Sequence, residues 1–299
     1  MTVTAPAPDR PSVKHRLAER GVDRTLLLLV PGVLFVVLLF AYPVLYGLQL
    51  SFQPSEGGGP FANYRRFFSD PYLFDTIWIT LRLALPAALI NVLASIPIAY
   101  RMRGRFRGKR LLTTILVVPI TLGTVLTAEG LIRYLDPVGW FNKILALFGA
   151  DEPVRLVHNY WGVLFSLIIT GLPFAFLLTL SYLSGIDPTL EQAAATLGAD
   201  RRRRFRYITL PLLAPGLAIT FCLTFVLAFS VFPSAYLVGL PQGETRVISI
   251  AAYEAAFRDS DYPLGSAIAM IMAVVMLAVI GLVLLWRSRL YRGATGGKG

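Results

Sequence analysis

Residues Leu190 to Pro215 read LEQAAATLGADRRRRFRYITLPLLAP, and they determine how the rest of the chain is interpreted. The stretch opens with alanine-rich sequence, passes through five arginines between Arg201 and Arg206, and ends in apolar residues that include Pro211. On both sides it is flanked by long stretches without a charged residue. The two flanking stretches therefore suit an apolar environment, whereas the arginine-rich segment between them suits water.

The apolar residues outside this segment are clustered in blocks. The chain is 56% hydrophobic and 15% charged, whereas a soluble globular domain is about 45–50% apolar and about 25% charged. Six blocks are long enough to cross a bilayer, and each must be helical because backbone polar groups in lipid need partners within their own segment. The sequence therefore predicts an all-α membrane protein with six transmembrane helices, at Leu26–Leu50, Thr76–Tyr100, Leu111–Ile132, Tyr160–Leu183, Ile208–Phe232 and Leu264–Trp286.

These helices set the expected domain organisation. We expect a cytoplasmic tail over residues 1–24, a transmembrane domain over 25–290 and a second cytoplasmic tail over 291–299. The first helix is too long for a signal peptide, and no small-residue cleavage site follows it promptly. The only sizeable inner loop is 184–207, which leaves no room for a catalytic domain on that side.

Three outer segments have their own patterns. The aromatic residues of 61–74 are typical of anchors lying at the membrane surface. The long segment Pro233–Pro263 is mixed in composition, and we expect it to be structured and able to receive a partner. In the second outer loop the apolar residues have near-helical spacing, which predicts a short helix there. These residues are Trp140, Ile144, Leu145 and Phe148.

The net charge of +11 reports topology. Twenty of the 28 Lys and Arg residues fall in 1–24, 101–110, 184–207 and 287–299, and seven fall on the opposite side. This asymmetry follows the positive-inside rule with both termini in the cytoplasm. Nucleic acid is not an expected partner, because no surface interleaves basic residues with stacking aromatics.

No cofactor, metal site or catalytic residue is expected. His15 and His158 lie in separate regions without ligand spacing, and the single cysteine, Cys222, permits no disulfide within the chain. The sequence GATGGKG at 293–299 lacks the first glycine and the Ser or Thr of a nucleotide-binding loop. Any nucleotide chemistry must therefore come from another chain.

The inner loop carries the signals of a short helix with both ends capped. Asp187 before a proline is a good N-terminus, and Gly198 is a good stop. A helix of this length is marginal alone in water, so it needs a surface to lie on. Asp200 can cap a second helix that runs through the arginines into the fifth span. One face of the first helix is formed by Leu190, Ala193, Ala194 and Leu197.

Two interpretations of this loop compete. Positive-inside bias alone accounts for the arginines, and we favour that interpretation for them. A loop that served only topology would not need a capped helix with an alanine face. For Asp187 to Gly198 we therefore favour a docking element that another protein receives.

The stretch from Glu191 to Pro215 resembles the EAA loop of permease subunits in binding-protein-dependent ABC importers. Gly198 and the Leu210-Pro211 pair hold the spacing of that motif, whereas its glutamate position falls on Gln192, one residue after Glu191. The sequence LLLVPGVLFVVLLFAYPVLYGLQLSF is similar to the family's first helix, and DYPLGSAIAM is similar to the start of its last helix. The resemblance extends over almost the whole chain.

The resemblance implies a type I ABC importer permease of the MetI-like superfamily in the bacterial plasma (inner) membrane. It implies a pore formed with a second permease subunit, two ABC ATPase subunits that drive it, and an extracytoplasmic solute-binding protein. The short inner helix would lie in a groove of the ATPase. The residues to which it assigns this coupling are Asp187, Leu190, Glu191, Gln192, Ala193, Ala194, Leu197, Gly198, Leu210 and Pro211.

The solute is less strongly indicated. The ATLGA sequence and the order of spans three and four look most like polyamine (spermidine/putrescine)-type permeases, and sugar-, iron-, thiamine- and sulfate-type permeases are the alternatives. Arg82 and Glu129 are candidates for the substrate path, because charge at membrane depth is costly. Glu129 would face the pore and favour a cation. Alternatively, the two residues pair with each other or snorkel independently.

Two other functional classes fit less well. A stand-alone secondary transporter is expected to show internal repeats or interrupted helices with charges at mid-depth. A membrane-embedded enzyme would need clusters of His, Asp or Glu within the spans. The sequence has neither pattern.

Overall fold

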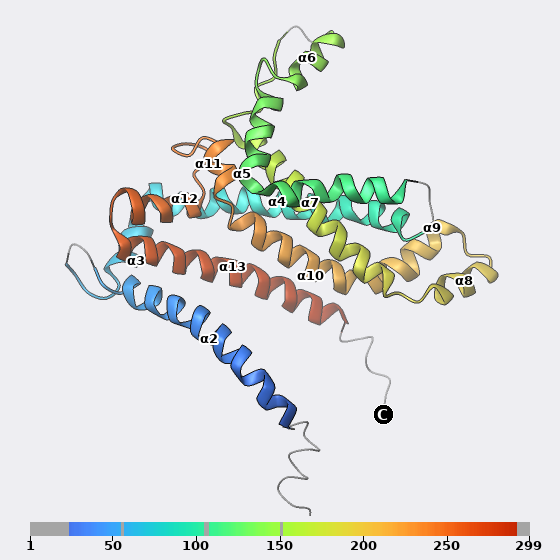
Figure 1. Cartoon of the computed structure of the whole chain (residues 1–299), viewed down its shortest axis with the longest axis horizontal. Helices are drawn as coiled ribbons and strands as arrows, with labels where there is room; N and C mark the ends of the chain where they lie inside the picture. Colours follow the sequence, from blue (N-terminus) through green and yellow to red (C-terminus); the bar gives the residue numbers. More distant parts are fainter. Residues whose placement is uncertain (1–23, 55–56, 105–107, 150–151, 292–299) are drawn as a thin grey trace, which may run out of the picture. The chain divides into compact units, whose positions relative to one another are not determined.

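The computed structural model describes residues 24–54, 57–104, 108–149 and 152–291, which fold into helices and loops without a strand in these ranges (Figure 1). Six helices are long and apolar enough to cross a membrane, which confirms the expected number. They are α2 (Arg24–Ser51), α4 (Pro71–Met102), α5 (Lys109–Leu135), α7 (Tyr160–Ser184), α10 (Leu210–Phe229) and α13 (Tyr262–Tyr291). The tails expected at 1–24 and 291–299 lie outside the described residues, apart from Arg24 and Tyr291.

The chain divides into two compact units, residues 1–50 and 51–299. Helix α2 forms the described part of the first unit. None of its most apolar window is buried, and large side chains such as Phe35 and Phe40 are exposed. A helix that is apolar on all sides has the surface of a membrane span.

The second unit is organised around α4, α7 and α10, which pack against one another, with α13 against α10 (Figure 1). Small residues on α4, among them Ala84, Ala87 and Ala88, are fully buried and permit close approach. On α7, a Cβ atom at Gly171 would lie 2.3 Å from Nδ2 of Asn91, which donates to the carbonyl of Leu167 at 3.2 Å. Glycine at this position therefore sets the spacing of α4 and α7.

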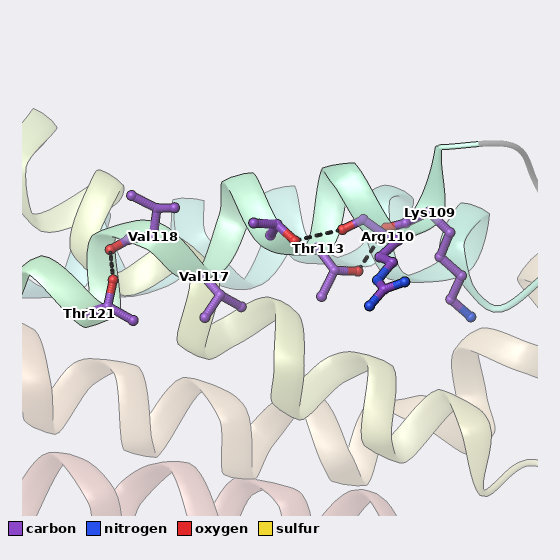
Figure 2. Close-up of a pocket in the computed structure, with 7 residues that line it drawn as sticks. Lys109, Arg110, Thr113, Val117, Val118 and Thr121 are labelled. Carbon is purple, nitrogen blue, oxygen red and sulfur yellow. Dashed lines mark hydrogen bonds between the residues drawn. The ribbon is translucent and has the colours of Figure 1, made fainter.

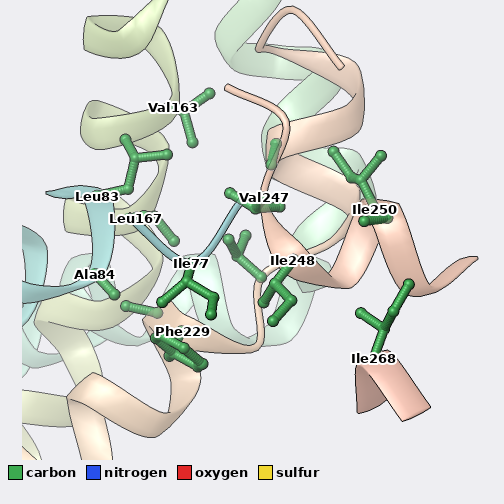
Figure 3. Packing of buried hydrophobic residues seen from close by; sticks show 14 of the residues in the cluster. Ile77, Leu83, Ala84, Val163, Leu167, Phe229, Val247, Ile248, Ile250 and Ile268 are labelled. Carbon is green, nitrogen blue, oxygen red and sulfur yellow. The ribbon is translucent and has the colours of Figure 1, made fainter. Parts of the chain in front are cut away.

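The largest buried cluster lies where α4 begins and α10 ends (Figure 3). Ile77 and Leu83 of α4 meet Val163 and Leu167 of α7, and Phe229 closes the cluster from the end of α10. Val247, Ile248 and Ile250 add side chains from the third outer segment. The segment expected to be structured is thus held by the core.

The other outer segments also form helices. The expected helix in the second outer loop is confirmed as α6 (Trp140–Leu147), and the third segment contains α11 (Pro233–Leu237), α12 (Ile248–Tyr253) and the π-helix η2 (Glu254–Arg258). Residues 62–69 form α3 (Ala62–Ser69), whose Phe67 is fully buried. The expectation that all of its aromatics are surface anchors is therefore wrong for Phe67.

The second span starts five residues earlier than expected, at Pro71. The Asp70 carboxylate accepts a hydrogen bond from the backbone N–H of Tyr72 at 2.9 Å, and proline occupies the first helical position. Both features favour a helix start. The apolar pattern alone missed this polar first turn.

A buried ion pair fixes the third outer segment against α4. Arg246 donates to Glu254 Oε2 from Nη2 at 2.8 Å and from Nε at 3.0 Å, and their side chains are 7% and 13% exposed. Arg246 also donates to the carbonyl of Tyr72 at 3.1 Å, and its guanidinium lies 3.9 Å from the centre of that ring. The guanidinium of Arg246 thus holds the third outer segment against the start of α4.

Candidate functional site

The capped helix expected in the inner loop is present as α8 (Pro188–Thr196). Asp187 accepts a hydrogen bond from the backbone N–H of Thr189 at 2.9 Å. This bond favours the ionised form and lowers the pKa of the Asp187 carboxyl. The N-terminus of α8 is therefore fixed by its own sequence.

The C-terminus of α8 ends in a Schellman motif. Gly198 has φ +84°, in the left-handed region that favours glycine. Its N–H donates to the carbonyl of Ala195 at 3.0 Å, and the N–H of Ala199 donates to Ala194 at 2.9 Å, which are the two bonds of that motif. Leu197 was expected on the helix face, but it is the C-cap residue and is 88% exposed.

The segment after Gly198 leads into the fifth span, as expected. Asp200 caps α9 (Arg201–Arg204) by accepting from the N–H of Arg203 at 2.8 Å. The π-helix η1 (Phe205–Thr209) follows and continues into α10. Pro211 clashes with regular α-helical geometry in the preceding turn, and a π-helical turn is one way to accommodate such a residue.

Helix α8 is exposed in the described structure. None of its residues is buried, and Leu190 is 47% exposed. Figure 1 shows α8 and α9 at the end of α7 and the start of α10, at the opposite end of these helices from α11 and α12. A short helix without its own core needs an external surface to keep its position.

Glu191 is the member of α8 with the most specific contacts. Its Oε1 accepts from Arg103 Nη1 at 2.7 Å and from Thr209 Oγ1 at 2.6 Å. Next to this contact is a cavity of about 310 Å³ lined by Tyr100, Arg103, Gly104, Pro188, Glu191, Gln192, Arg201 and Arg204. The expected coupling residues thus adjoin a basic cavity.

A second feature lies within α5, the third of the six candidate membrane helices. Gly123 has φ 72° and ψ 173°, so the helical path is broken there, and Figure 1 shows the two parts of α5 running in different directions. A cavity of about 320 Å³ adjoins the break, between α5, α7 and α10. Its lining includes the hydroxyls of Thr124, Thr170, Thr224, Ser230 and Ser234 and contains no charged side chain among the described residues.

The first part of α5 borders another open cavity, of about 760 Å³ (Figure 2). Its lining combines Lys109 and Arg110 with threonines and valines along one helix face. The Thr113 hydroxyl donates to the carbonyl of Lys109 at 2.9 Å, as drawn in Figure 2. One face of α5 therefore carries polar side chains from its first turn to near the break at Gly123.

The two charged candidates for the substrate path lie apart from this lining. Glu129 pairs with Arg133 on the next turn of α5 at 3.5 Å, and the two side chains are 52% and 80% exposed. Arg82 lies in a different cavity, of about 560 Å³, lined by Asp75, Trp78, Ile79, Arg82, Tyr160 and Glu244. The alternative of an Arg82–Glu129 pair is therefore wrong, because Glu129 contacts Arg133.

Sequence reasoning did not find Arg103, Thr209 or Gly123. Arg103 was counted only as one of the cytoplasmic charges, and Thr209 was read as part of a span. A glycine four residues after Pro119 was the available signal for the break in α5. Within the described ranges, no group of three or more His, Cys, Asp or Glu side chains is arranged to hold a metal.

Comparison with solved structures defines the class of fold. One chain of a bacterial alginate ABC transporter, crystallised in complex with an alginate pentasaccharide-bound periplasmic protein, matches with a TM-score of 0.76 and 23% identity over 94% of this chain and 98% of that chain. A chain of the inward-facing MetNI methionine ABC transporter matches with a TM-score of 0.56 over 75% of this chain. The fold is that of a type I ABC importer permease.

The sequence identifies the family. Residues 91–292 match the binding-protein-dependent transport system inner membrane component family, and the chain belongs to it. It is therefore a multi-pass inner-membrane protein and the permease subunit of a binding-protein-dependent ABC importer.

Relatives in this family transport different solutes. The chain is 28% identical to the trehalose/maltose transport system permease protein MalF of Thermococcus litoralis, covering 89% of this chain and 92% of that protein. It is 27% identical to the sulfate permease protein CysT of Salmonella typhimurium, with coverage of 89% and 93%. It is 29% identical to the spermidine/putrescine permease protein PotB of Escherichia coli, with coverage of 76% and 81%. Identity alone does not single out a solute.

Proposed function

We propose that α8 is the element through which ATP hydrolysis by a partner chain drives this permease. The proposal rests on one observation: α8 is capped at both ends and has no buried residue. Its small residues suit a groove on an ATPase subunit. In this proposal both termini and α8 are cytoplasmic, and the complex contains a second permease subunit, two ATPase subunits and an extracytoplasmic solute-binding protein.

Replacing Ala193 with Glu tests the docking of α8. The substitution adds bulk and charge to an exposed position on α8, and an unpaired charge in an interface is costly. We expect at least a tenfold loss of the ATPase that co-purifies with the permease from membranes in which both chains are expressed. An Arg202→Gln variant, changed at an exposed residue of α9, serves as the control. Full co-purification of the Ala193→Glu variant would contradict the proposal.

For the solute we propose a neutral, hydroxylated molecule of the carbohydrate class. The cavity beside Gly123 supports this, because threonine and serine residues and no charged residue are part of its mainly apolar lining. Three of these hydroxyls donate to carbonyls of their own helices and can still accept a hydrogen bond. Such a lining exchanges hydrogen bonds with a polyhydroxylated solute and leaves no charge unpaired. The similarity to the trehalose/maltose permease of Thermococcus litoralis is in keeping with this class.

A polyamine-like cation is the second candidate. Asp75 and Glu244, together with the aromatic side chains of Trp78 and Tyr160, line the cavity that also contains Arg82. Carboxylates and aromatic faces are the groups that attract an organic cation. The guanidinium in the same cavity opposes that attraction. The expected role of Glu129 in this path lacks support, because its carboxylate pairs with Arg133.

Uptake by the wild-type transporter distinguishes the two candidates, and Glu129→Gln tests whether Glu129 belongs to the substrate path. An exposed ion pair of this kind contributes about 0.2–1 kcal/mol, so we expect assembly to be retained and uptake to remain within about twofold of wild type. The measurement is uptake of labelled trehalose and of labelled spermidine by cells that express the whole transporter. Spermidine uptake that falls sharply in the variant would favour the cation and return Glu129 to the substrate path.

A further inference from the structure

Glu191 faces the body of the protein, away from the open side of α8. Its carboxylate receives Arg103, which follows the last turn of α4, and Thr209, the last residue of η1. The same guanidinium donates from Nη2 to the carbonyl of Ile186 at 3.1 Å, in the segment that joins α7 to α8. One carboxylate therefore connects α8 to the end of α4 and to the start of α10, and its partner Arg103 also contacts the segment after α7.

This contact differs from an ordinary surface ion pair. The Arg103 and Glu191 side chains are each 18% exposed, and Thr209 is fully buried. Charge-assisted hydrogen bonds are shorter and stronger than neutral ones, and shielding from water weakens their screening. By contrast, Glu129 and Arg133 are largely exposed and 3.5 Å apart. The contact at Glu191 is suited to hold α8 in one position.

The neighbouring residue clarifies the role of this carboxylate. Gln192 occupies the position where the motif places a glutamate. Adjacent residues on an α-helix point about 100° apart, and Gln192 is exposed whereas Glu191 is partly buried. The carboxylate of Glu191 is thus directed into the permease, whereas Gln192 lies on the exposed side of α8.

We propose that Glu191 is a positioning residue that locks α8 to α4 and to the start of α10, so that a displacement of α8 moves both helices together. The inference rests on the docking role proposed for α8. Arg103 and Thr209 are the partners through which Glu191 acts. Without the lock, α8 can still bind a partner, but its movement is no longer passed to the membrane helices.

Hydrogen exchange in the full-length permease in lipid nanodiscs tests the lock without any partner chain. We expect Glu191→Gln to increase amide exchange in residues 189–197 by about tenfold or more, because a hydrogen-bonded charge is lost. Exchange in α4 and α7 should remain unchanged. The exchanged pair Arg103→Glu with Glu191→Arg should restore part of the protection, since the ion pair returns but the bond to the Ile186 carbonyl does not, and Arg202→Gln should have no effect. Exchange of Glu191→Gln within twofold of wild type would overturn the proposal.

A second readout separates positioning from simple stability. In proteoliposomes containing the complete transporter, ATP hydrolysis is measured with and without the purified cognate binding protein. In Glu191→Gln the ratio of stimulated to basal hydrolysis should fall at least fivefold, and the exchanged pair should recover part of that ratio. Undiminished stimulation would overturn the lock. Failure of the docking proposal would appear instead as wild-type permease that does not retain the ATPase, a result independent of the exchange experiment.

Discussion

Gly198→Val is expected to abolish transport while leaving the permease folded in the membrane. The glycine has φ +84°, a conformation that costs an L-residue roughly 1–2 kcal/mol, and more for a β-branched side chain. Valine would therefore break the two Schellman bonds and change how α8 leads into α9. No neighbouring atom lies within 4 Å of a Cβ at this position, so the expected effect comes from the backbone and not from a steric clash.

Gly198→Asn provides the matched comparison, since asparagine tolerates the left-handed conformation better than other residues with a side chain. We expect Gly198→Val to lose tenfold or more of both uptake and ATPase retention, and Gly198→Asn to retain most of both. Equal loss in the two variants would show that bulk at this position matters and that the left-handed backbone does not. Thermal unfolding in detergent should change little for either, because α8 contributes no buried residue.

Arg246→Ala is expected to cause the largest loss of stability of any single substitution proposed for this chain. The arginine is 7% exposed and holds Glu254, the Tyr72 carbonyl and the Tyr72 ring. Removing one member of a buried pair costs about 3–5 kcal/mol, because the remaining charge stays buried. Glu254 keeps a longer contact of 3.6 Å with Arg258, which favours the lower end of that range.

The measurement is unfolding of the detergent-solubilised permease by heat or denaturant. Arg133→Ala is the control, because its pair with Glu129 is exposed and contributes about 1 kcal/mol at most. The double variant Arg246→Met with Glu254→Gln should recover part of the loss, since no buried charge is then left alone. Arg246→Ala with wild-type stability would mean that water reaches Glu254 and that the third outer segment is held by its apolar residues alone.

The candidate site was predictable where its signals are local in sequence. Asp187 and Gly198 bound α8 as expected, because a capping side chain and a left-handed glycine act within a few residues. The predicted and observed bounds differ at two helix ends: α4 starts earlier than expected, and α8 ends earlier, at Thr196. Helix ends are the least certain part of such a prediction, because polar turns weaken the apolar pattern there.

The sequence by itself determined that six apolar helices cross the membrane and that a capped helix lies between two of them, because hydropathy and helix capping depend on neighbouring residues. Only the tertiary structure decided which side chains meet. Glu191 finds Arg103, 88 positions away, whereas Glu129 pairs within its own helix and not with Arg82. The first pairing depends on how α4, α8 and α10 pack, since a charge pairs with whichever opposite charge the packed helices bring near it, whereas the second joins residues four apart on one helix.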